Sequence, residues 1–167
     1  MNNYKPKREI ELYPSMLKWL QEYLENKHPK ATIKTYDVHS VDLSDFIQRN
    51  KYTKYFPEYA TFKIRVDLLG VILKKDKCSL VFVEVKDTPL SLINLSQLLG
   101  YCKILRPDFA FLISPKGLSK PLSQLLVHFN RLDILEFSKN KYVRVAKWNP
   151  SKNAIEIDSI IPPLGNL

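Results

Sequence analysis

The sequence predicts a mixed α/β domain in which flanking helices cover a central sheet. Some segments repeat apolar residues every three or four positions and others alternate or run continuously, so helices and strands are interspersed along the chain. A strand, a helix and a second strand follow one another from Val81 to Ile113, which favours parallel pairing of the two strands. The 167 residues, 45% of them hydrophobic, suit one domain over residues 1–167.

The first element is expected to be a helix over residues 9–27, because Leu12, Met16 and Leu20 recur at helical spacing. Pro14 fits within a first helical turn, which places the start near residue 12 or 13, and Pro29 ends the helix. The remaining elements follow from apolar patterns bounded by turn residues. They are strands over 31–39, 65–73, 79–86, 108–114, 132–137, 142–148 and 154–157, and helices over 44–48, 92–105 and 119–129.

Composition indicates a soluble protein with a polyanionic partner. The net charge of +9 attracts nucleic acid, because lysines and arginines that neutralise phosphates release bound counterions. No apolar run reaches the length of a membrane span, and residues 1–8 do not form a signal peptide, so a cytoplasmic location without membrane attachment is expected. Two distant cysteines are too few for a structural zinc site, and no glycine-rich phosphate loop is present.

Charged residues interrupt two otherwise apolar strands. Glu84 and Lys86 are two positions apart, so both side chains lie on one face of their strand. If Lys75 and Asp76 form the centre of the connecting turn, paired residue numbers add to 151 and Asp67 lies opposite Glu84. Two carboxylates this close in a partly dry site repel each other, and a divalent cation relieves that repulsion.

The series Asp67, Glu84-Val85-Lys86 resembles the signature of the PD-(D/E)XK nucleases, a family that includes restriction enzymes, Holliday-junction resolvases and RecB-like nucleases. The resemblance implies a restriction-endonuclease-like fold and a Mg²⁺ or Mn²⁺ ion held by Asp67, Glu84 and the main-chain carbonyl of Val85. It gives Lys86 the role of positioning the attacking water and stabilising the developing anion. No proline precedes Asp67, a departure that the family tolerates widely.

Two further features match this family. Gln97 and Tyr101 are four positions apart on one helix face, similar to the Q-x-x-x-Y element that lies beside the metal in RecB-like nucleases and touches the DNA. Glu11 stands early in the first helix, from which the family often supplies an acid, and Glu9 is the alternative. Acids also favour the first turn of any helix because of its dipole.

The expected function is metal-dependent DNA hydrolysis by a restriction-type or structure-selective endonuclease, acting as a homodimer on family grounds. Aromatic and basic residues alternate between the first helix and the metal strand, where they can stack on bases or grip phosphates. The alternatives are a non-catalytic nucleic-acid-binding protein on the same fold and an interaction domain with a chance motif, and RNA remains open as the substrate. The predicted nucleic-acid contacts are Lys51, Tyr52, Lys54, Tyr55 and Arg65.

Overall fold

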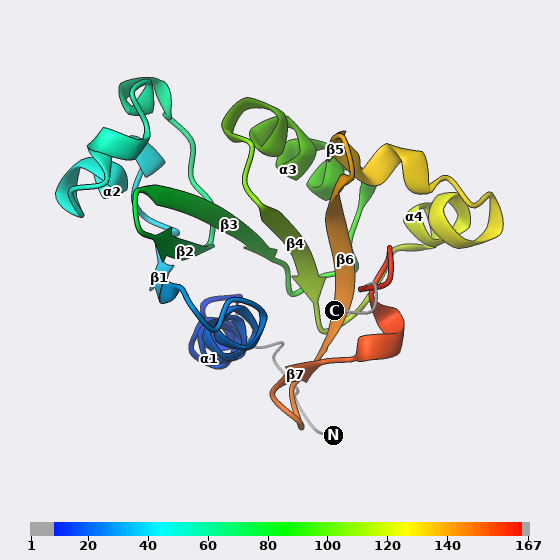
Figure 1. The fold of residues 1–167 in the computed structure, drawn as a ribbon. Coiled ribbons are helices and arrows are strands. Elements are labelled where there is room, and N and C mark those ends of the chain that lie inside the picture. The colour runs from blue at the N-terminus through cyan, green and yellow to red at the C-terminus, as the bar shows by residue number, and fades with distance from the viewer. Residues whose placement is uncertain (1–8, 165–167) are drawn as a thin grey trace.

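A mixed seven-stranded sheet forms the centre of the molecule (Figure 1). The computed structural model describes residues 9–164; the expectations for residues 1–8 and for the end of the tail, 165–167, fall outside this range. The strand order is β1-β2-β3-β4-β6-β5, and β7 pairs with β6. The strands are β1 (Thr32–Asp37), β2 (Leu68–Lys74), β3 (Lys77–Val85), β4 (Phe109–Ser114), β5 (Glu136–Ser138), β6 (Lys141–Asn149) and β7 (Ala154–Ile155).

The pairing confirms the predicted class. β3 pairs with β4 in parallel, as the crossover predicted, and β4 pairs with β6 in parallel as well. The pairs β1–β2, β2–β3, β5–β6 and β6–β7 are antiparallel. A mixed sheet with three central parallel strands needs cover on both faces, which explains the continuous apolar runs of β3 and β4.

Helices cover the two faces of the sheet as separate layers (Figure 1). On one face, α1 (Glu9–Lys27) buries Met16, Leu20 and Leu24 against β2 and β3. On the other face, a second core forms beneath α2, α3 and α4. These helices are α2 (Leu43–Arg49), α3 (Leu92–Leu105) and α4 (Lys120–Ser123), and α3 has the bounds that the sequence predicted.

Several elements differ from the prediction. α1 already includes Glu9, so Pro14 lies inside the helix, where it faces solvent while Leu12, Tyr13 and Met16 pack inward. The predicted helix 119–129 divides into α4 and a π-helical turn, Gln124–His128. The predicted strand 132–137 is a 3₁₀ turn, Leu132–Leu135, followed by the short β5. Tertiary packing therefore overrides local propensity mainly after residue 119.

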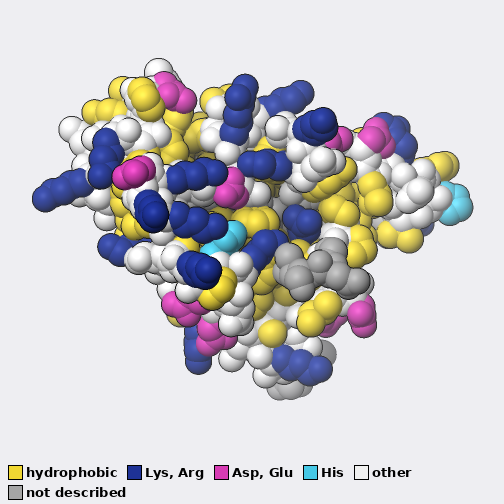
Figure 2. Space-filling view, in the orientation of Figure 1, with side chains coloured by type: hydrophobic (Ala, Val, Ile, Leu, Met, Phe, Trp, Pro, Cys, Tyr) yellow, Lys and Arg dark blue, Asp and Glu magenta, His cyan; other side chains and the backbone are white. Residues whose placement is uncertain are grey.

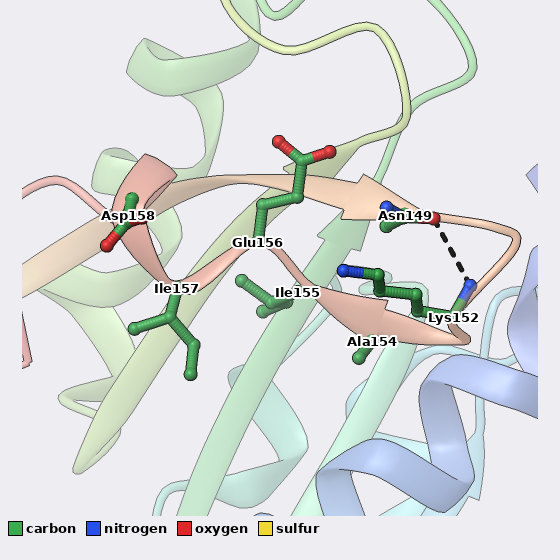
Figure 3. Close-up of a pocket in the computed structure, with 7 residues that line it drawn as sticks. All are labelled: Asn149, Lys152, Ala154, Ile155, Glu156, Ile157 and Asp158. Carbon is green, nitrogen blue, oxygen red and sulfur yellow. Dashed lines mark hydrogen bonds between the residues drawn. The ribbon is translucent and has the colours of Figure 1, made fainter.

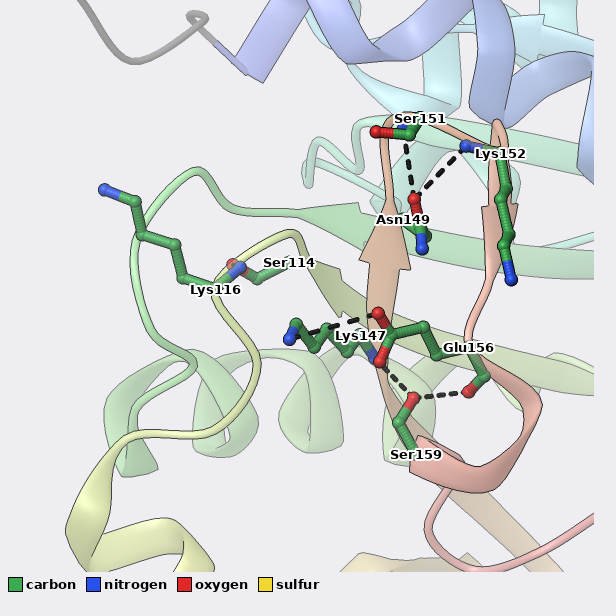
Figure 4. A network of polar contacts seen from close by, with 8 residues as sticks. All are labelled: Ser114, Lys116, Lys147, Asn149, Ser151, Lys152, Glu156 and Ser159. Atoms are coloured by element: carbon green, nitrogen blue, oxygen red, sulfur yellow. Dashed lines mark hydrogen bonds and ion pairs between the residues drawn. The ribbon is translucent and has the colours of Figure 1, made fainter. Parts of the chain in front are cut away.

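Polar contacts fasten the C-terminal segment to β6 (Figure 4). The main-chain N–H of Lys147 donates to Ser159 Oγ at 2.8 Å, and that hydroxyl donates to the carbonyl of Glu156 at 2.6 Å. Asn149 Oδ1 accepts from the N–H groups of Ser151 and Lys152 and closes the turn before β7.

Within residues 9–164, the helices are too short or too polar to cross a membrane.

Candidate active site

The hairpin of β2 and β3 has the register that places the two acids together. Lys74 pairs with Lys77 and Leu68 pairs with Val83, so paired numbers add to 151 as predicted. Asp67 is the residue immediately before β2, and continuation of the register sets it opposite Glu84. The Oδ2 atom of Asp67 accepts the main-chain N–H of Val85 at 2.8 Å. The main chain of β3 at its last residue, Val85, therefore holds the Asp67 carboxylate in place.

The charge of Asp67 and the surrounding protein make ionisation of Glu84 unfavourable. Burial, the negative charge of Asp67 and a hydrogen bond between the two side chains raise the pKa of Glu84 to about 8, and Lys86 partly offsets this rise. Two carboxylates that share a partly dry site behave in this way when no cation lies between them. The pair is therefore arranged to gain from a bound positive charge.

The N-terminal end of α1 contributes two side chains to the same place. Tyr13 is buried, and burial, the charge of Asp67 and a side-chain hydrogen bond with Asp67 raise the pKa of its hydroxyl. Burial raises the pKa of Glu9, nearby Lys86 lowers it, and Asp67 raises it. Lys86 also lowers the pKa of Glu84, so its ammonium influences both acids.

The sequence predicted Glu11 as the helix acid, with Glu9 as the alternative, and it is Glu9 that lies near Lys86 in the structure. Glu11 is exposed to solvent, whereas Glu9 is half-buried near Lys86. Glu9 and Tyr13 continue the inward stripe of Met16 and Leu20 at spacings of three and four residues. The same spacing in the sequence could have identified both Glu9 and the missed Tyr13.

The main-chain groups of Val85 lie on the same side of β3 as the Asp67 carboxylate. The N–H of Lys86 binds the carbonyl of Ile113 on β4, so the polar groups of Val85 point to the opposite side, where Asp67 lies. The carbonyl of Val85 is thus available beside the two carboxylates. Mg²⁺ commonly uses one or two carboxylates and completes its shell with water and substrate phosphate. Within residues 9–164, no cluster of three or more His, Cys, Asp or Glu side chains is able to hold a metal.

The two residues predicted on α3, Gln97 and Tyr101, hydrogen-bond to each other. Gln97 Nε2 donates to Tyr101 Oη at 2.9 Å, and Gln97 is exposed. In the described part of the chain, no hydrogen bond connects either residue to Asp67 or Glu84. The inward face of α3 instead buries Cys102, and burial, together with the charge of nearby Glu84, raises the thiol pKa to about 12.

The predicted nucleic-acid contacts divide into surface and core residues. Lys51 and Lys54 are exposed, and Lys54 lies over the half-buried ring of Tyr55 at 4.9 Å. Arg65 is also exposed and pairs with Asp42 at 2.8 Å. Tyr52 is in the core, with its hydroxyl 3.1 Å from that of Tyr36, which corrects its prediction as a base-stacking residue. Its aromatic ring packs near Phe46 because α2 needs an apolar partner there.

A cavity of about 450 Å³ lies at the turn between β6 and β7, away from the acids (Figure 3). Its lining mixes Lys152 with Glu156 and Asp158 and with exposed Ile157. Glu156 is already 3.9 Å from the ammonium of Lys147. The cavity therefore lacks the concentrated charge that distinguishes the acid pair.

Comparisons with models of known families, with characterised proteins and with solved structures found no match to this chain. The resemblance to PD-(D/E)XK nucleases consequently depends on the residues and geometry of the site alone.

Proposed function

We propose that this chain is a metal-dependent endonuclease that hydrolyses DNA phosphodiester bonds on a restriction-endonuclease-like fold. The observation that carries the proposal is the position of Asp67 opposite Glu84 at one end of the hairpin, with Lys86 directly after β3. Charged groups beside buried apolar strands are costly unless another charge, a hydrogen bond or a metal compensates them. Their concentration at one sheet end therefore supports a catalytic use.

Asp67, Glu84 and the carbonyl of Val85 would hold Mg²⁺ or Mn²⁺. When bound, the metal would supply an activated water and stabilise negative charge on the phosphate. Lys86 would orient the attacking water and stabilise the developing anion with its ammonium group. The negative charge of Glu9, which lies near Lys86, would attract its ammonium group and so favour positions of that side chain close to the site.

The positive surface supports DNA as the substrate. The chain carries 26 Lys and Arg against 17 Asp and Glu, and Lys51, Lys54 and Arg65 are exposed. Such residues contact phosphates without reading base sequence. Cleavage of both strands by a small enzyme requires two sites, so the proposal includes a homodimer. A restriction-type and a structure-selective endonuclease both fit this description.

Cleavage of a DNA panel tests the proposal. The panel holds supercoiled plasmid, linear duplex, single strand, flap and four-way junction, each with Mg²⁺, Mn²⁺ or EDTA. The expected result is cutting that requires the metal and favours one substrate. Preference for a junction or flap would indicate a structure-selective enzyme, and cutting at fixed plasmid positions would indicate a restriction type.

Three variants locate the activity. Asp67→Asn keeps an acceptor for the N–H of Val85 and removes one metal-binding charge, and Lys86→Ala removes the ammonium. Each is expected to reduce cutting about a hundredfold or more, as removal of a group that stabilises transition-state charge does. Asp76→Asn makes the same chemical change on the exposed turn of the hairpin and should cut like wild type. Equal activity in all variants would contradict the assigned site.

A second candidate is a non-catalytic nucleic-acid-binding protein on this fold. The observation in its favour is that residues 9–164 offer two adjacent carboxylates at the site and no cluster of three metal-binding side chains. This candidate predicts salt-dependent DNA binding without cutting under any metal condition. Binding by wild type and Asp67→Asn with equal affinity, and no product from either, would establish it.

A further inference from the structure

The opposite end of α1 carries a group of basic and polar side chains. Tyr23, Lys27 and His28 stand at the C-terminal end of the helix, and Arg144 comes from β6 on the face that α1 covers. Arg144 alternates along β6 with Val143 and Val145, which face the other core. Figure 2 shows Lys and Arg side chains gathered across the middle and left of one face of the molecule, with a histidine among them. The surrounding residues are Lys74, Asp108, Phe109 and Lys141.

The two innermost cations have no carboxylate partner within residues 9–164. The ammonium of Lys27 lies over the ring of Phe109 at 4.3 Å, and burial, together with the charge of nearby Arg144, lowers the pKa of Lys27. The nearby acid, Asp108, is already 3.2 Å from the ammonium of Lys141. Positive charge therefore exceeds negative charge where the side chains are half-buried.

Three hydrogen-bond donors in this group are buried without an acceptor in the described part of the chain. They are Tyr23 Oη, Arg144 Nε and His28 Nε2. Lys74 Nζ lies 3.2 Å from His28 Nδ1, and because an ammonium only donates, Nδ1 accepts and neutral His28 carries its proton on Nε2. Buried donors without acceptors are unfavourable, and two of the three, on Tyr23 and His28, belong to residues that line one cavity, so acceptor atoms that enter it would relieve this cost.

A cavity of about 430 Å³ opens at this position and is lined by Tyr23, Asn26, Lys27 and His28. Its lining supplies an ammonium, a ring N–H, an amide and a phenol, all able to donate. A carboxylate has two oxygens for these donors, whereas a phosphate group presents three or four and carries more charge.

We propose that this cluster is a binding site for a phosphate group. Glu9 and Lys27 are 18 residues apart on α1, which separates the phosphate site from the acid pair by about 27 Å at the rise of an α-helix. The proposal is therefore independent of the proposed nuclease activity. The phosphate belongs either to a nucleic acid strand or to a free phosphorylated compound, because both present the same oxygens.

Calorimetric titration with inorganic phosphate at constant ionic strength tests the site. Wild type and Asp67→Asn should bind phosphate saturably and with equal affinity, so that this result is separate from the nuclease proposal. Lys27→Gln and Arg144→Gln should each weaken binding about tenfold or more, as loss of a charge-assisted hydrogen bond does. Lys18→Gln, an equal charge change on an exposed position of the same helix, should bind like wild type.

Thermal unfolding of each variant checks that it is folded. If Arg144→Gln does not fold, the phosphate affinity of Lys27→Gln alone tests the proposal. The histidine ring signals supply a second readout, because bound phosphate should raise the pKa of His28 in wild type. Absence of saturable phosphate binding, or equal weakening in Lys18→Gln, would overturn the proposal.

DNA binding measured at several salt concentrations distinguishes the two sources of the phosphate group, a DNA strand and a free phosphorylated compound. If the phosphate comes from a DNA strand, Lys27→Gln reduces the slope of log K against log salt by about one, and DNA competes with inorganic phosphate. If the source is a free compound, Lys27→Gln weakens phosphate binding and leaves the DNA slope unchanged. A wild-type protein that binds DNA with the same slope as Lys27→Gln and does not bind phosphate would have no such site.

Discussion

The two ends of α1 have opposite chemistry. At the N-terminal end, Asp67 and Glu84 bring two acids together, and the raised pKa of Glu84 reflects burial and their repulsion. At the C-terminal end, Lys27 and Arg144 bring two cations together, and the lowered pKa of Lys27 reflects burial and that repulsion. The helix dipole complements both groups, since its positive end faces the acids and its negative end faces the cations.

If both proposals hold, one helix supports two sites that favour ligands of opposite sign. The dipole offsets part of each excess charge, but a helix end supplies only about half an elementary charge, which is less than either cluster carries. A cation at one end and an anion at the other would complete the balance. The distance of about 27 Å along α1 would keep two such ligands electrostatically separate at physiological salt.

A substitution that weakens the packing of α1, the helix that both sites share, should have the largest effect on stability. Leu20 is fully buried in the middle of α1, and Gly70 of β2 leaves room for it and for Leu24. Leu20→Ala should lower the free energy of unfolding by about 2–5 kcal/mol through lost burial and a cavity. Urea denaturation measures this change, and affinities for Mn²⁺ and phosphate should fall together. Loss at one end with the other intact would show that α1 does not couple the two sites.

The acid end should lose stability as pH rises. The folded-state pKa of Glu84, about 8, exceeds its ordinary value of 4.5, so the folded protein binds more protons between these values. This contribution is present below pH 4.5 and is lost as pH rises through 8, by on the order of 1–3 kcal/mol. Urea denaturation in EDTA from pH 5 to 8 measures it. Glu84→Gln should flatten the profile, and a wild-type profile that is already flat would contradict the raised pKa.

The sequence was sufficient for the hairpin and the acid pair because both depend on local order. A tight turn at Lys75 and Asp76 determines the register, and strand alternation then places Asp67, Glu84 and Lys86 on one side. The helix α3 was equally predictable, since Ser91 and Asn94 form a capping box at its start. Local signals of this kind require no knowledge of distant contacts.

The basic end was not predictable from the same signals. Arg144 and Lys27 are 117 positions apart in the sequence, and only the order β4-β6 in the sheet brings them together. Tyr52 was misassigned for a related reason, since an aromatic residue between lysines has the same pattern whether its ring stacks on a base or packs against Phe46. Contacts between distant segments decide such cases, and pattern analysis of one sequence does not contain them.

The contact between Tyr13 and Asp67 permits a finer test of the acid end. Tyr13→Phe removes the hydroxyl that hydrogen-bonds Asp67 and leaves the buried ring in place. Because partners of metal ligands orient them, the variant should bind Mn²⁺ about tenfold more weakly, while stability changes by about 1 kcal/mol or less. Metal titration followed by calorimetry measures the affinity. Tyr59→Phe, on a half-buried ring of the α2 side, is the control, and equal weakening in both variants would exclude a positioning role.

The basic end should respond to pH in the opposite direction and by the smallest amount. Burial and the charges of Lys74 and Lys27 lower the pKa of His28 below 6.5, so the unfolded chain binds its proton more readily. The stabilisation is present above pH 6.5 and is lost as pH falls below it, and because His28 is partly exposed and screened the loss should be about 0.5 kcal/mol or less. Denaturation of wild type and His28→Gln at pH 5.5 and 7.5 measures the difference. Added phosphate should remove this loss of stability at pH 5.5 in wild type but not in His28→Gln, since a bound anion offsets the positive charges that oppose protonation of His28. If phosphate stabilises both proteins equally at both pH values, the anion does not bind beside His28.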